Sequence, residues 1–546
     1  MEGLKLQHSE KLLGYVKKHA DDTPDKTAIN FYGRQITYQE LDDLSDRLAT
    51  AIADMGYKKG DRVAAFLQTS PQCYVLYLAA MKLGLIIAPI DPMSKELELE
   101  YALNDSGARL IVAFDQVYPV VESVEDRCEL KDVIVTSFSD YLPRKPTISL
   151  HKMMKPPKQR FPDTYEFSGL IEKYTPHPPK VDVRPDDYAW ILYTGGTTGL
   201  PKGCLHTQYD LVLSAWGWSQ LGYECTSEDV LLISWPHTHI SGISHGLAPT
   251  LFSGMTIIPL ARWDALAAME AISKYKVTLL HWAVPQFWNV INHPDRQNYD
   301  LTSLKRAFVA PFAMPITDDL VKKWRELTGC PLYDSGYGSS EHMNYVSHGT
   351  GLTFLKRPPC TTFGRLAPGV QIKIVDFETG KELPEGEEGE IVTKEPAQLK
   401  RYWNKPEENK RDIVDGWLHT HDRGYIKEGI LYFVAKVSDI CKVRGYTVSL
   451  KEVETYGAMH SAVDRIAVIA LPDPKSGSRL KAFVILKPGT KLTAPELEEW
   501  FKEKVAVFKR PVVEIRKELP TSGKGDILKR ELVKEELGKT GKEVKP

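Results

Sequence analysis

An alternation of strand and helix signals near the start of the chain constrains its fold more than any other feature. D-R-V-A-A-F-L (61–67) has the short apolar run of a buried strand, and L-I-I-A-P-I (85–90) is another. Between them, S-P-Q-C-Y-V-L-Y-L-A-A-M-K (70–82) has a proline near its start, where a helix tolerates it. The same alternation recurs around 229–260 and 277–312. This spacing predicts parallel sheets with helices on their faces, an α/β fold.

The longest apolar region, residues 74–90, is not expected to cross a membrane. It is interrupted by Lys82 and Gly84 and is too short to span a bilayer. The N-terminus, M-E-G-L-K-L-Q-H-S-E, lacks the apolar run of a signal peptide. The seven cysteines are scattered and never form C-x-x-C, which is typical of reduced thiols. These features predict a cytoplasmic protein without integral membrane association.

The length of the chain predicts more than one domain. Its 546 residues are too many for a single hydrophobic core. The last segment is large enough to fold alone, with strands expected at 465–471 and 480–487 and a helix at 494–507. We therefore divide the chain into an N-terminal domain, 1–437, and a C-terminal domain, 438–546.

The balance of charges limits the kind of partner that the protein can bind. The chain has 70 basic Lys and Arg residues against 72 Asp and Glu, which gives a net charge of −2. A uniformly basic surface for nucleic acid is therefore absent, so any anion site must be local. We expect small-molecule partners and no nucleic acid.

The most specific segment is Y-T-G-G-T-T-G-L-P-K-G (193–203), which follows an apolar strand predicted to end at Tyr193 or Thr194. Its glycines let backbone N–H groups turn inward, its threonines add hydroxyl donors and its lysine adds charge, which together suit a polyphosphate. The pattern differs from the Walker loop, because Lys202 follows proline and precedes glycine. The candidate phosphate-binding residues are Thr194, Gly195, Gly196, Thr197, Thr198, Gly199 and Lys202.

This loop resembles the phosphate loop of the adenylate-forming superfamily, which contains acyl-CoA synthetases, luciferases and peptide-synthetase adenylation domains. The segments 36–49 and 58–64 resemble the opening of that family, and 506–511 resembles the end of its closing helix. The resemblance covers nearly the whole chain. It implies a large N-terminal domain of sheets flanked by helices, followed by a small mobile α+β C-terminal domain.

The resemblance implies that Y-G-S-S-E (337–341) binds adenine and a metal ion. The residue types agree with this role, because Tyr337 offers a flat face to a purine and Gly338 adds no side chain. Ser340 and Glu341 offer oxygen ligands that suit Mg²⁺ bound to phosphates. Taken alone, the same pentapeptide is also common in turns.

The segment W-L-H-T-H-D (417–422) is similar to the ribose-binding segment of the family, with Asp422 accepting hydrogen bonds from the ribose hydroxyls. His421 stands where the family usually has glycine. Downstream, Lys436 occupies the position of a second ribose contact, where arginine is usual. The resemblance implies that the hinge between the domains falls at Ser438 and Asp439.

Three histidines occur in S-W-P-H-T-H-I-S-G-I-S-H (234–245), and their spacing leaves a metal site, a pocket wall and an inert core as alternatives. Zinc is disfavoured because no cysteine or acidic partner is near in the sequence. The resemblance implies that His239 lies at the wall between the acyl pocket and the α-phosphate.

The acid substrate is predicted from position alone. Small-acid members of the family have tryptophan at the position of Gly338, so glycine suggests a deeper pocket for a medium-chain fatty acid or one of similar size. The segment V-A-P-F-A-M-P (309–315) lacks the glycine pair that usually precedes its Ala-Pro. The candidate pocket residues are His239, Trp282, Phe287, Phe312, Ser335 and Gly338.

The segment L-P-T-S-G-K-G-D-I-L (519–528) resembles the catalytic lysine turn of the family, which is usually L-P-K-T-x-S-G-K-I-L-R-R. Matching S-G-K selects Lys524, with two residues shifted across the motif. An ungapped alignment instead places Asp526 in that position. We favour Lys524, because an aspartate at an anionic centre would be repulsive, and a protein with no lysine there remains the alternative.

The resemblance implies a two-step reaction that uses ATP, Mg²⁺ and coenzyme A. A carboxylic acid first gives acyl-AMP and pyrophosphate, and the thiol of coenzyme A then displaces AMP. Because the first step brings two anions together, cations are required at the reacting centre. We assign catalytic roles to Lys524, His239 and Glu341, and we expect the C-terminal domain to present Gly445 for the second step.

Three other functions remain open at this stage. The first is delivery of the acyl group to a carrier-protein thiol, and the second is a luciferase-type oxidation. The third is a homologue that binds an acyl group or a nucleotide and has lost adenylation. The sequence also leaves a homodimer open.

Overall fold

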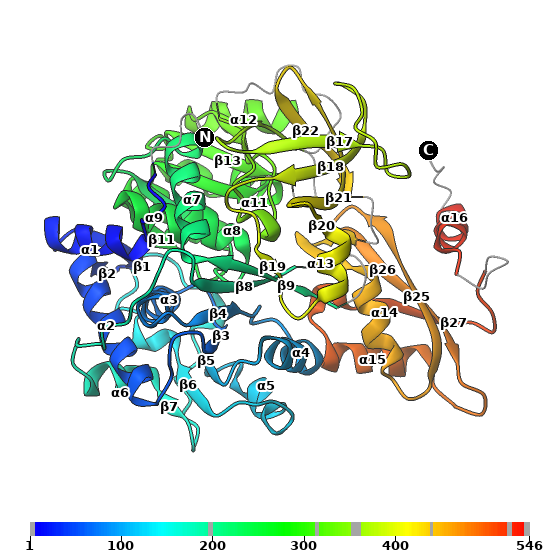
Figure 1. Ribbon diagram of the computed structural model, residues 1–546, viewed down its shortest axis with the longest axis horizontal. Coiled ribbons are helices and arrows are strands. Elements are labelled where there is room, and N and C mark those ends of the chain that lie inside the picture. Colours follow the sequence, from blue (N-terminus) through cyan, green and yellow to red (C-terminus); the bar gives the residue numbers. More distant parts are fainter. Residues whose placement is uncertain are drawn as a thin grey trace.

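The computed structural model describes residues 6–194, 200–311, 316–350, 362–436, 440–520 and 527–539. Within these ranges, four β-sheets and their helices form a large N-terminal part and a smaller C-terminal part (Figure 1). The predicted fold class, an α/β protein with a large first part and a small second part, is confirmed.

The first sheet is parallel except at one edge, where β1 and β2 form an antiparallel hairpin. Its strand order is β14 (Leu332–Asp334), β13 (Arg306–Ala310), β12 (Leu279–Ala283), β10 (Val230–Ile233), β11 (Thr256–Pro259), β1 (Thr27–Phe31) and β2 (Arg34–Thr37). Helices α10 (Ala265–Tyr275), α11 (Val284–Ile291) and α12 (Asp318–Thr328) connect its parallel strands. The strand and helix alternation predicted in this region is confirmed.

The second sheet contains the predicted elements near the N-terminus and the strands that flank the phosphate loop. Its strand order is β19 (Arg401–Tyr402), β9 (Lys202–Thr207), β8 (Tyr188–Thr194), β4 (Ile86–Pro89), β3 (Arg62–Phe66), β5 (Leu110–Phe114), β6 (Asp132–Thr136) and β7 (Tyr165–Glu166). It is parallel from β8 to β7 and antiparallel where β8 meets β9 and where β9 meets β19.

The third sheet is antiparallel, and this part of the sequence has the short strands and turns typical of such sheets. Its order is β15 (Ser347–His348), β16 (Thr362–Leu366), β22 (Ile430–Lys436), β21 (Trp417–Lys427), β18 (Gly389–Lys394) and β17 (Gln371–Val375), with β20 (Ile413–Val414) paired to β21. Helix α13 (Pro406–Asp412) precedes β20.

The fourth sheet forms the smaller part, which begins after β22 ends at Lys436. Its strands are β24 (Tyr446–Ser449), β23 (Ile440–Val443), β26 (Gly477–Leu486) and β25 (Val463–Asp473), and β27 (Val512–Ile515) pairs with β26. Helices α14 (Leu450–Ala458), α15 (Ala494–Lys504) and α16 (Lys529–Lys539) belong to this part. The two strands and the helix predicted here are present.

The remaining helices cover the sheets of the larger part. They are α1 (Leu12–Asp22), α2 (Tyr38–Asp54), α3 (Pro71–Leu83), α4 (Glu96–Ser106), α5 (Tyr118–Glu122), α6 (Phe167–Lys173), α7 (Gln208–Gly217), α8 (Ile240–Gly242) and α9 (Ala248–Ser253). Helix α3 is buried along almost its whole length, as expected for an apolar run that begins at a proline and ends at a left-handed glycine, Gly84. Its one charge, Lys82, pairs with Asp42 and Asp46 of α2. Among the described residues, no helix has the length and apolar character that a bilayer span requires.

A buried lysine joins the two parts of the protein. The Lys509 ammonium lies 2.6 Å from Glu98 of α4 and 2.8 Å from Glu452 of α14. Glu98 also accepts a hydrogen bond from the Ala506 backbone N–H at 2.8 Å. The two carboxylates pull the pKa of Lys509 upward against the effect of burial. Figure 1 shows α15 beside α4 at this contact.

Replacing this lysine, Lys509→Met, should strongly destabilise the smaller part, because two buried carboxylates would lose their cation. We expect a loss of about 3–5 kcal/mol in the free energy of unfolding, measured by denaturant titration of Trp fluorescence. The control is Lys502→Met, because Lys502 is half exposed and pairs with the exposed Glu499. That variant should stay within about 0.5 kcal/mol of the parent. Equal effects in the two variants would contradict a structural role for the buried pair.

Candidate active site

The strands β8 and β9 hold both ends of the predicted phosphate loop. Strand β8 ends at Thr194, as predicted, and its last residue pairs in antiparallel register with Lys202, the first residue of β9. The loop residues Gly195, Gly196, Thr197, Thr198 and Gly199 lie outside the described residues. The loop therefore connects two antiparallel strands, unlike a Walker loop, which leads from a strand into a helix.

The structure places Lys202 in a buried ion pair. Its ammonium lies 3.1 Å from Asp412 and 4.0 Å from the centre of the Tyr402 ring, and the residue is only 4% exposed. The predicted role of this lysine was to contact the outer phosphates. In this structure, the Lys202 ammonium pairs with the carboxylate of Asp412, the last residue of α13.

Asp412 is the centre of a charged network that the sequence analysis did not find. Arg411 and His421 bond to its carboxylate, His421 at 2.9 Å. Burial alone would raise the pKa of Asp412, but these hydrogen bonds and the charge of Lys202 hold it well below its usual range. His421 also lies 3.4 Å from Glu390.

The position of His421 carried a signal for this network. The family usually has glycine there, and His421 adopts a φ of 56°, a conformation that favours glycine. The two contacts of its ring, to Asp412 and Glu390, account for a histidine in this strained position. A histidine at a position where the family usually has glycine was therefore the sequence signal for a buried partner of its side chain.

Tyr337 and Asp422, two predicted nucleotide-binding residues, are brought together by the fold. The Tyr337 hydroxyl donates a hydrogen bond of 2.8 Å to Asp422 Oδ2, and both side chains are buried. The Tyr337 ring is nearly parallel to that of Phe433 on β22, with ring centres 5.7 Å apart. Asp422 is also paired in register with Lys436, whose side chain lies outside the described residues.

Glu341 lies beside the phosphate-loop strands. Its carboxylate accepts hydrogen bonds from Ser339 at 2.7 Å and from Tyr402 at 3.3 Å, and the side chain is partly exposed. Tyr402 also faces Lys202, so this ring lies between the predicted metal ligand and the end of the phosphate loop. Ser340 is anchored through its carbonyl oxygen, 2.7 Å from His206. A partly exposed carboxylate at this position fits the hard, oxygen-preferring Mg²⁺ ion.

His239 caps the short helix α8 and faces the smaller part of the protein. Its Nδ1 accepts a hydrogen bond of 3.1 Å from the Ser241 backbone N–H, and its ring lies nearly parallel to Trp235. Although the side chain is exposed, desolvation by the surrounding protein and then the positive charge of Lys442 lower its pKa to about 4. His239 is therefore neutral near pH 7, and the β23–β24 hairpin that carries Lys442 lies close to it.

Gly445 stands at the turn of that same hairpin, between β23 and β24. It has a φ of 88° and follows Arg444, which has a φ of 52°. Two successive residues with positive φ suit a tight two-residue hairpin turn. Lys442, whose charge acts on His239, lies on the first strand of this hairpin, three residues before Gly445.

The three histidines of the segment 234–245 do not converge on one point. His237 bonds to Tyr74 at 2.6 Å, His239 caps α8 and His245 stacks on His281 at 3.8 Å between ring centres. In the described ranges, no group of three or more metal-ligating side chains has the arrangement of a metal site.

Trp282 and Phe287, two predicted pocket walls, lie in the hydrophobic core away from His239. Both are fully buried, and both rings pack against Trp324 of α12. Because neighbouring residues of a strand face opposite sides of the sheet, Trp282 points away from the side occupied by His281. The structure therefore does not bring these two side chains together with His239 and Gly338.

Gly338 and Ser335 follow β14 and lie near each other along the chain. A Cβ at Gly338 would meet the Asn344 Cα at 2.7 Å, so only glycine fits this close approach. The space beside Gly338 is thus occupied by Asn344. Ser335 donates its backbone N–H to the Val309 carbonyl at 3.2 Å.

Four other predicted site residues lie outside the described residues: Phe312, Ser438, Asp439 and Lys524.

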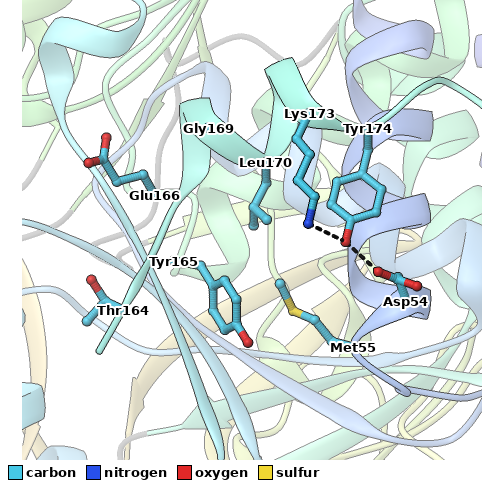
Figure 2. Close-up of a pocket in the computed structure, with 9 residues that line it drawn as sticks. All are labelled: Asp54, Met55, Thr164, Tyr165, Glu166, Gly169, Leu170, Lys173 and Tyr174. Atoms are coloured by element: carbon cyan, nitrogen blue, oxygen red, sulfur yellow. Dashed lines mark hydrogen bonds between the residues drawn. The ribbon is translucent and has the colours of Figure 1, made fainter. Parts of the chain in front are cut away.

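A separate surface hollow of about 410 Å³ lies between the end of α2 and α6 (Figure 2). The Tyr174 hydroxyl there bonds to Asp54 and to Lys173. None of its lining residues belongs to the predicted site. We assign it no role.

Solved structures of adenylate-forming enzymes share this fold and this arrangement of segments. An anthranilate CoA ligase in complex with anthranoyl-AMP is 25% identical, with a TM-score of 0.72 over 99% of this chain and all of its own. An o-succinylbenzoate CoA synthetase from Bacillus subtilis aligns with a TM-score of 0.80 at 24% identity, over 96% of this chain and 98% of its own. The fold is that of adenylate-forming enzymes.

The chain belongs to the AMP-binding enzyme family, which it matches over residues 16–403, and its residues 452–525 match the AMP-binding enzyme C-terminal domain. A long-chain-fatty-acid–CoA ligase of Bacillus subtilis is 33% identical over 94% of this chain and 92% of its own length. A fatty acid–[acyl-carrier-protein] ligase of Streptomyces coeruleorubidus is 28% identical over 97% of this chain and 98% of its own. The family predicted from the phosphate loop is confirmed.

Removing the hydroxyl that links the two segments predicted to bind the nucleotide, in Tyr337→Phe, should weaken ATP binding. The buried Asp422 would lose a donor, and a hydrogen bond to a charged group contributes about 1.5–3 kcal/mol. We expect the KM for ATP to rise about tenfold or more, measured by pyrophosphate release. Tyr345→Phe is the matched control, because that buried hydroxyl donates to the Pro368 carbonyl. An equal rise in both variants would argue against the link.

Replacing Lys442 should raise the pKa of His239, because the lysine charge opposes protonation of the imidazole. In Lys442→Met the pKa should move up from about 4 and stay below its ordinary value, since desolvation, the larger cause, persists. NMR titration of the His239 ring protons measures this shift. Arg444→Met, on the same hairpin, is the control and should leave the titration unchanged. No shift in Lys442→Met would mean that the hairpin does not face His239 in solution.

Proposed function

We propose that this protein is an acyl-CoA synthetase, an AMP-forming acid–thiol ligase that uses ATP and coenzyme A. The observation that carries the proposal is the Tyr337–Asp422 hydrogen bond, which joins the adenine and ribose segments next to Glu341. This arrangement supplies a nucleotide site at the end of the β8–β9 hairpin. The long-chain-fatty-acid–CoA ligases among the relatives support the reaction class.

The reaction joins two anions and therefore needs activation. A carboxylate oxygen attacks the α-phosphorus of ATP, the bond from that phosphorus to the bridging oxygen breaks, and pyrophosphate leaves with the electron pair. The coenzyme A sulfur, as thiolate, then attacks the acyl carbonyl, and AMP leaves. Mg²⁺ held by Glu341 and Ser340 would supply positive charge to the phosphates when bound. Neutral His239 would border the acid without adding a charge of its own.

The smaller part offers two different faces, which suits the two steps. On one face, Val468 belongs to a cluster packed against Met93 and Leu97 of the larger part. On the other face, Leu519 packs with Ile469 beneath α16. Leu519 precedes the Lys524 segment, and Figure 1 shows α16 beyond the small sheet, away from the larger part. We infer that this orientation serves thioester formation and that the smaller part rotates to bring Lys524 to the α-phosphate.

Pyrophosphate–ATP exchange with a panel of acids tests this function most directly. We propose a medium-chain fatty acid, or an acid of similar size, as substrate, and coenzyme A as the acceptor. Exchange that depends on the acid, followed by thioester formation only when coenzyme A is added, would support both. A thioester formed only on a carrier protein would overturn the acceptor. Absence of exchange with every acid would overturn adenylation. The proposed site of action is the cytoplasm.

The variant Lys524→Ala tests the two-step assignment. Loss of one charge-stabilising contact should slow adenylation by about 10²–10³, while thioester formation from supplied acyl-AMP should continue at the parent rate. Lys517→Ala is the matched control, because Lys517 is exposed and lies just before the same turn. Unchanged pyrophosphate release in Lys524→Ala would refute the lysine and favour the alternative in which no lysine serves this step.

A further inference from the structure

Three buried histidines form a cluster that the proposed reaction does not use. His245, His281 and His348 come from three separate elements, and each is at most 6% exposed. His245 and His281 stack with ring centres 3.8 Å apart, and Trp218 contacts all three rings at 4.1, 5.1 and 4.8 Å. The cluster is therefore a compact group of imidazoles around one indole ring.

Most of the ring nitrogens in this cluster lack a hydrogen-bond partner. Within the described part of the chain, no partner is found for His245 Nδ1, for His281 Nε2, or for either nitrogen of His348. The other two nitrogens have long contacts, His281 Nδ1 with the Tyr223 hydroxyl at 3.3 Å and His245 Nε2 with the Asn344 amide at 3.4 Å. Buried polar atoms without partners are costly and rare in native proteins. Four ring nitrogens without a partner in one cluster therefore favour a site that binds a ligand.

A nearby histidine shows how this chain satisfies an imidazole that serves only the core. His237 is fully buried, its Nε2 lies 2.6 Å from the Tyr74 hydroxyl, and its Nδ1 lies 3.3 Å from the Trp235 carbonyl oxygen. Both of its nitrogens are therefore used. The contrast with His348, in which neither is used, separates the cluster from ordinary core packing.

The three imidazoles are uncharged at neutral pH. Burial, followed by the neighbouring imidazoles, holds the pKa of His245 well below its usual value. Burial lowers the pKa of His281 and of His348 to about 3. A neutral imidazole has one N–H donor and one acceptor nitrogen, so the cluster offers both and adds no charge. It suits an uncharged oxygen that can donate or accept a hydrogen bond.

The cluster lies next to the residues that border the acid in the proposed function. His245 follows His239 by six residues in one continuous run of helical turns, about 9 Å along a helix axis. On the other side, Gly338 contacts Asn344, whose amide in turn contacts His245 and Ser244. The cluster thus lies next to Asn344, which separates it from Gly338, and about 9 Å along the chain from His239, which matches the length of a short acid.

We propose that the histidine cluster binds a hydroxyl or carbonyl oxygen at the far end of the carboxylic acid substrate. This proposal rests on the proposed function, because the cluster selects the acid that the adenylation site activates. The substrate class is then an oxygen-substituted acid of medium length or one with a single ring. A pocket built to hydrogen-bond a substrate oxygen rejects the analogue that lacks it far more strongly than an apolar pocket distinguishes one methylene.

Matched pairs of acids test this specificity. Pyrophosphate release is measured with hexanoate and octanoate and with their ω-hydroxy and ω-oxo counterparts. We expect kcat/KM to be at least about tenfold higher for an oxygen-substituted acid than for its unsubstituted match. Higher values for the unsubstituted acids would overturn the proposal and leave the ligase function intact. Absence of pyrophosphate release in both series would instead overturn the ligase function.

The variant His348→Leu separates ligand binding from packing. Because no described residue bonds to its ring nitrogens, we expect an unchanged or higher Tm together with at least a tenfold loss of the preference for the oxygen-substituted acid. The matched control, His237→Leu, breaks two hydrogen bonds and should lower the Tm while leaving the preference unchanged. His281→Phe, which keeps an aromatic ring in the cluster, should reduce the preference as well.

Two outcomes of these variants would overturn the proposal. A lower Tm with an unchanged preference in His348→Leu would show a structural histidine and overturn the proposal. If His348→Leu fails to fold, His281→Phe decides by the same ratio of kcat/KM values, and an unchanged ratio there would overturn the proposal.

Discussion

The hydrogen bond from Tyr337 to Asp422 joins segments 85 residues apart, and the arrangement of the proposed active site depends on it. Tyr337 follows the last strand of a parallel sheet, whereas Asp422 lies on a central strand of the antiparallel sheet. Each sheet forms from its own local pattern, so a contact between them decides how the turn that carries Glu341 is oriented. Tyr402 then contacts both Glu341 and Lys202 and connects this turn to the phosphate-loop strands.

Away from this hydrogen bond, ion pairs neutralise lysines inside the protein. The chain has nearly equal numbers of acidic and basic residues, and two lysines that are largely withdrawn from solvent in the described part of the chain are paired with carboxylates. Lys202 faces Asp412, and Lys509 is placed between two carboxylates at the contact of the two parts. In the proposed reaction, the cations for the polyanionic ATP would therefore come from bound Mg²⁺ and from the smaller part. Lys442 of the smaller part adds to the desolvation that lowers the pKa of His239.

The histidine cluster and the relatives point to different features of the acid. The relatives include long-chain-fatty-acid–CoA ligases, whose name specifies fatty acids, whereas the cluster around Trp218 in this chain offers polar nitrogens. Both are consistent with a carbon chain that ends in an oxygen. Burial keeps these imidazoles neutral, which makes an uncharged oxygen a better partner than a carboxylate. Gly338 does not decide the depth of this region, because Asn344 occupies the space beside it.

The sequence by itself determined the elements whose signal is local. The alternation over 61–90 predicted two strands and a helix, and the glycines and threonines of 193–203 predicted the loop and its family, because periodicity and backbone freedom are properties of neighbouring residues. Only the tertiary structure decided the long-range partners. The contact of Lys202 with Asp412 spans 210 residues, and Trp282 packs against Trp324 of α12 on the face of the strand opposite His281. Such contacts depend on how separate sheets pack, which no local pattern contains.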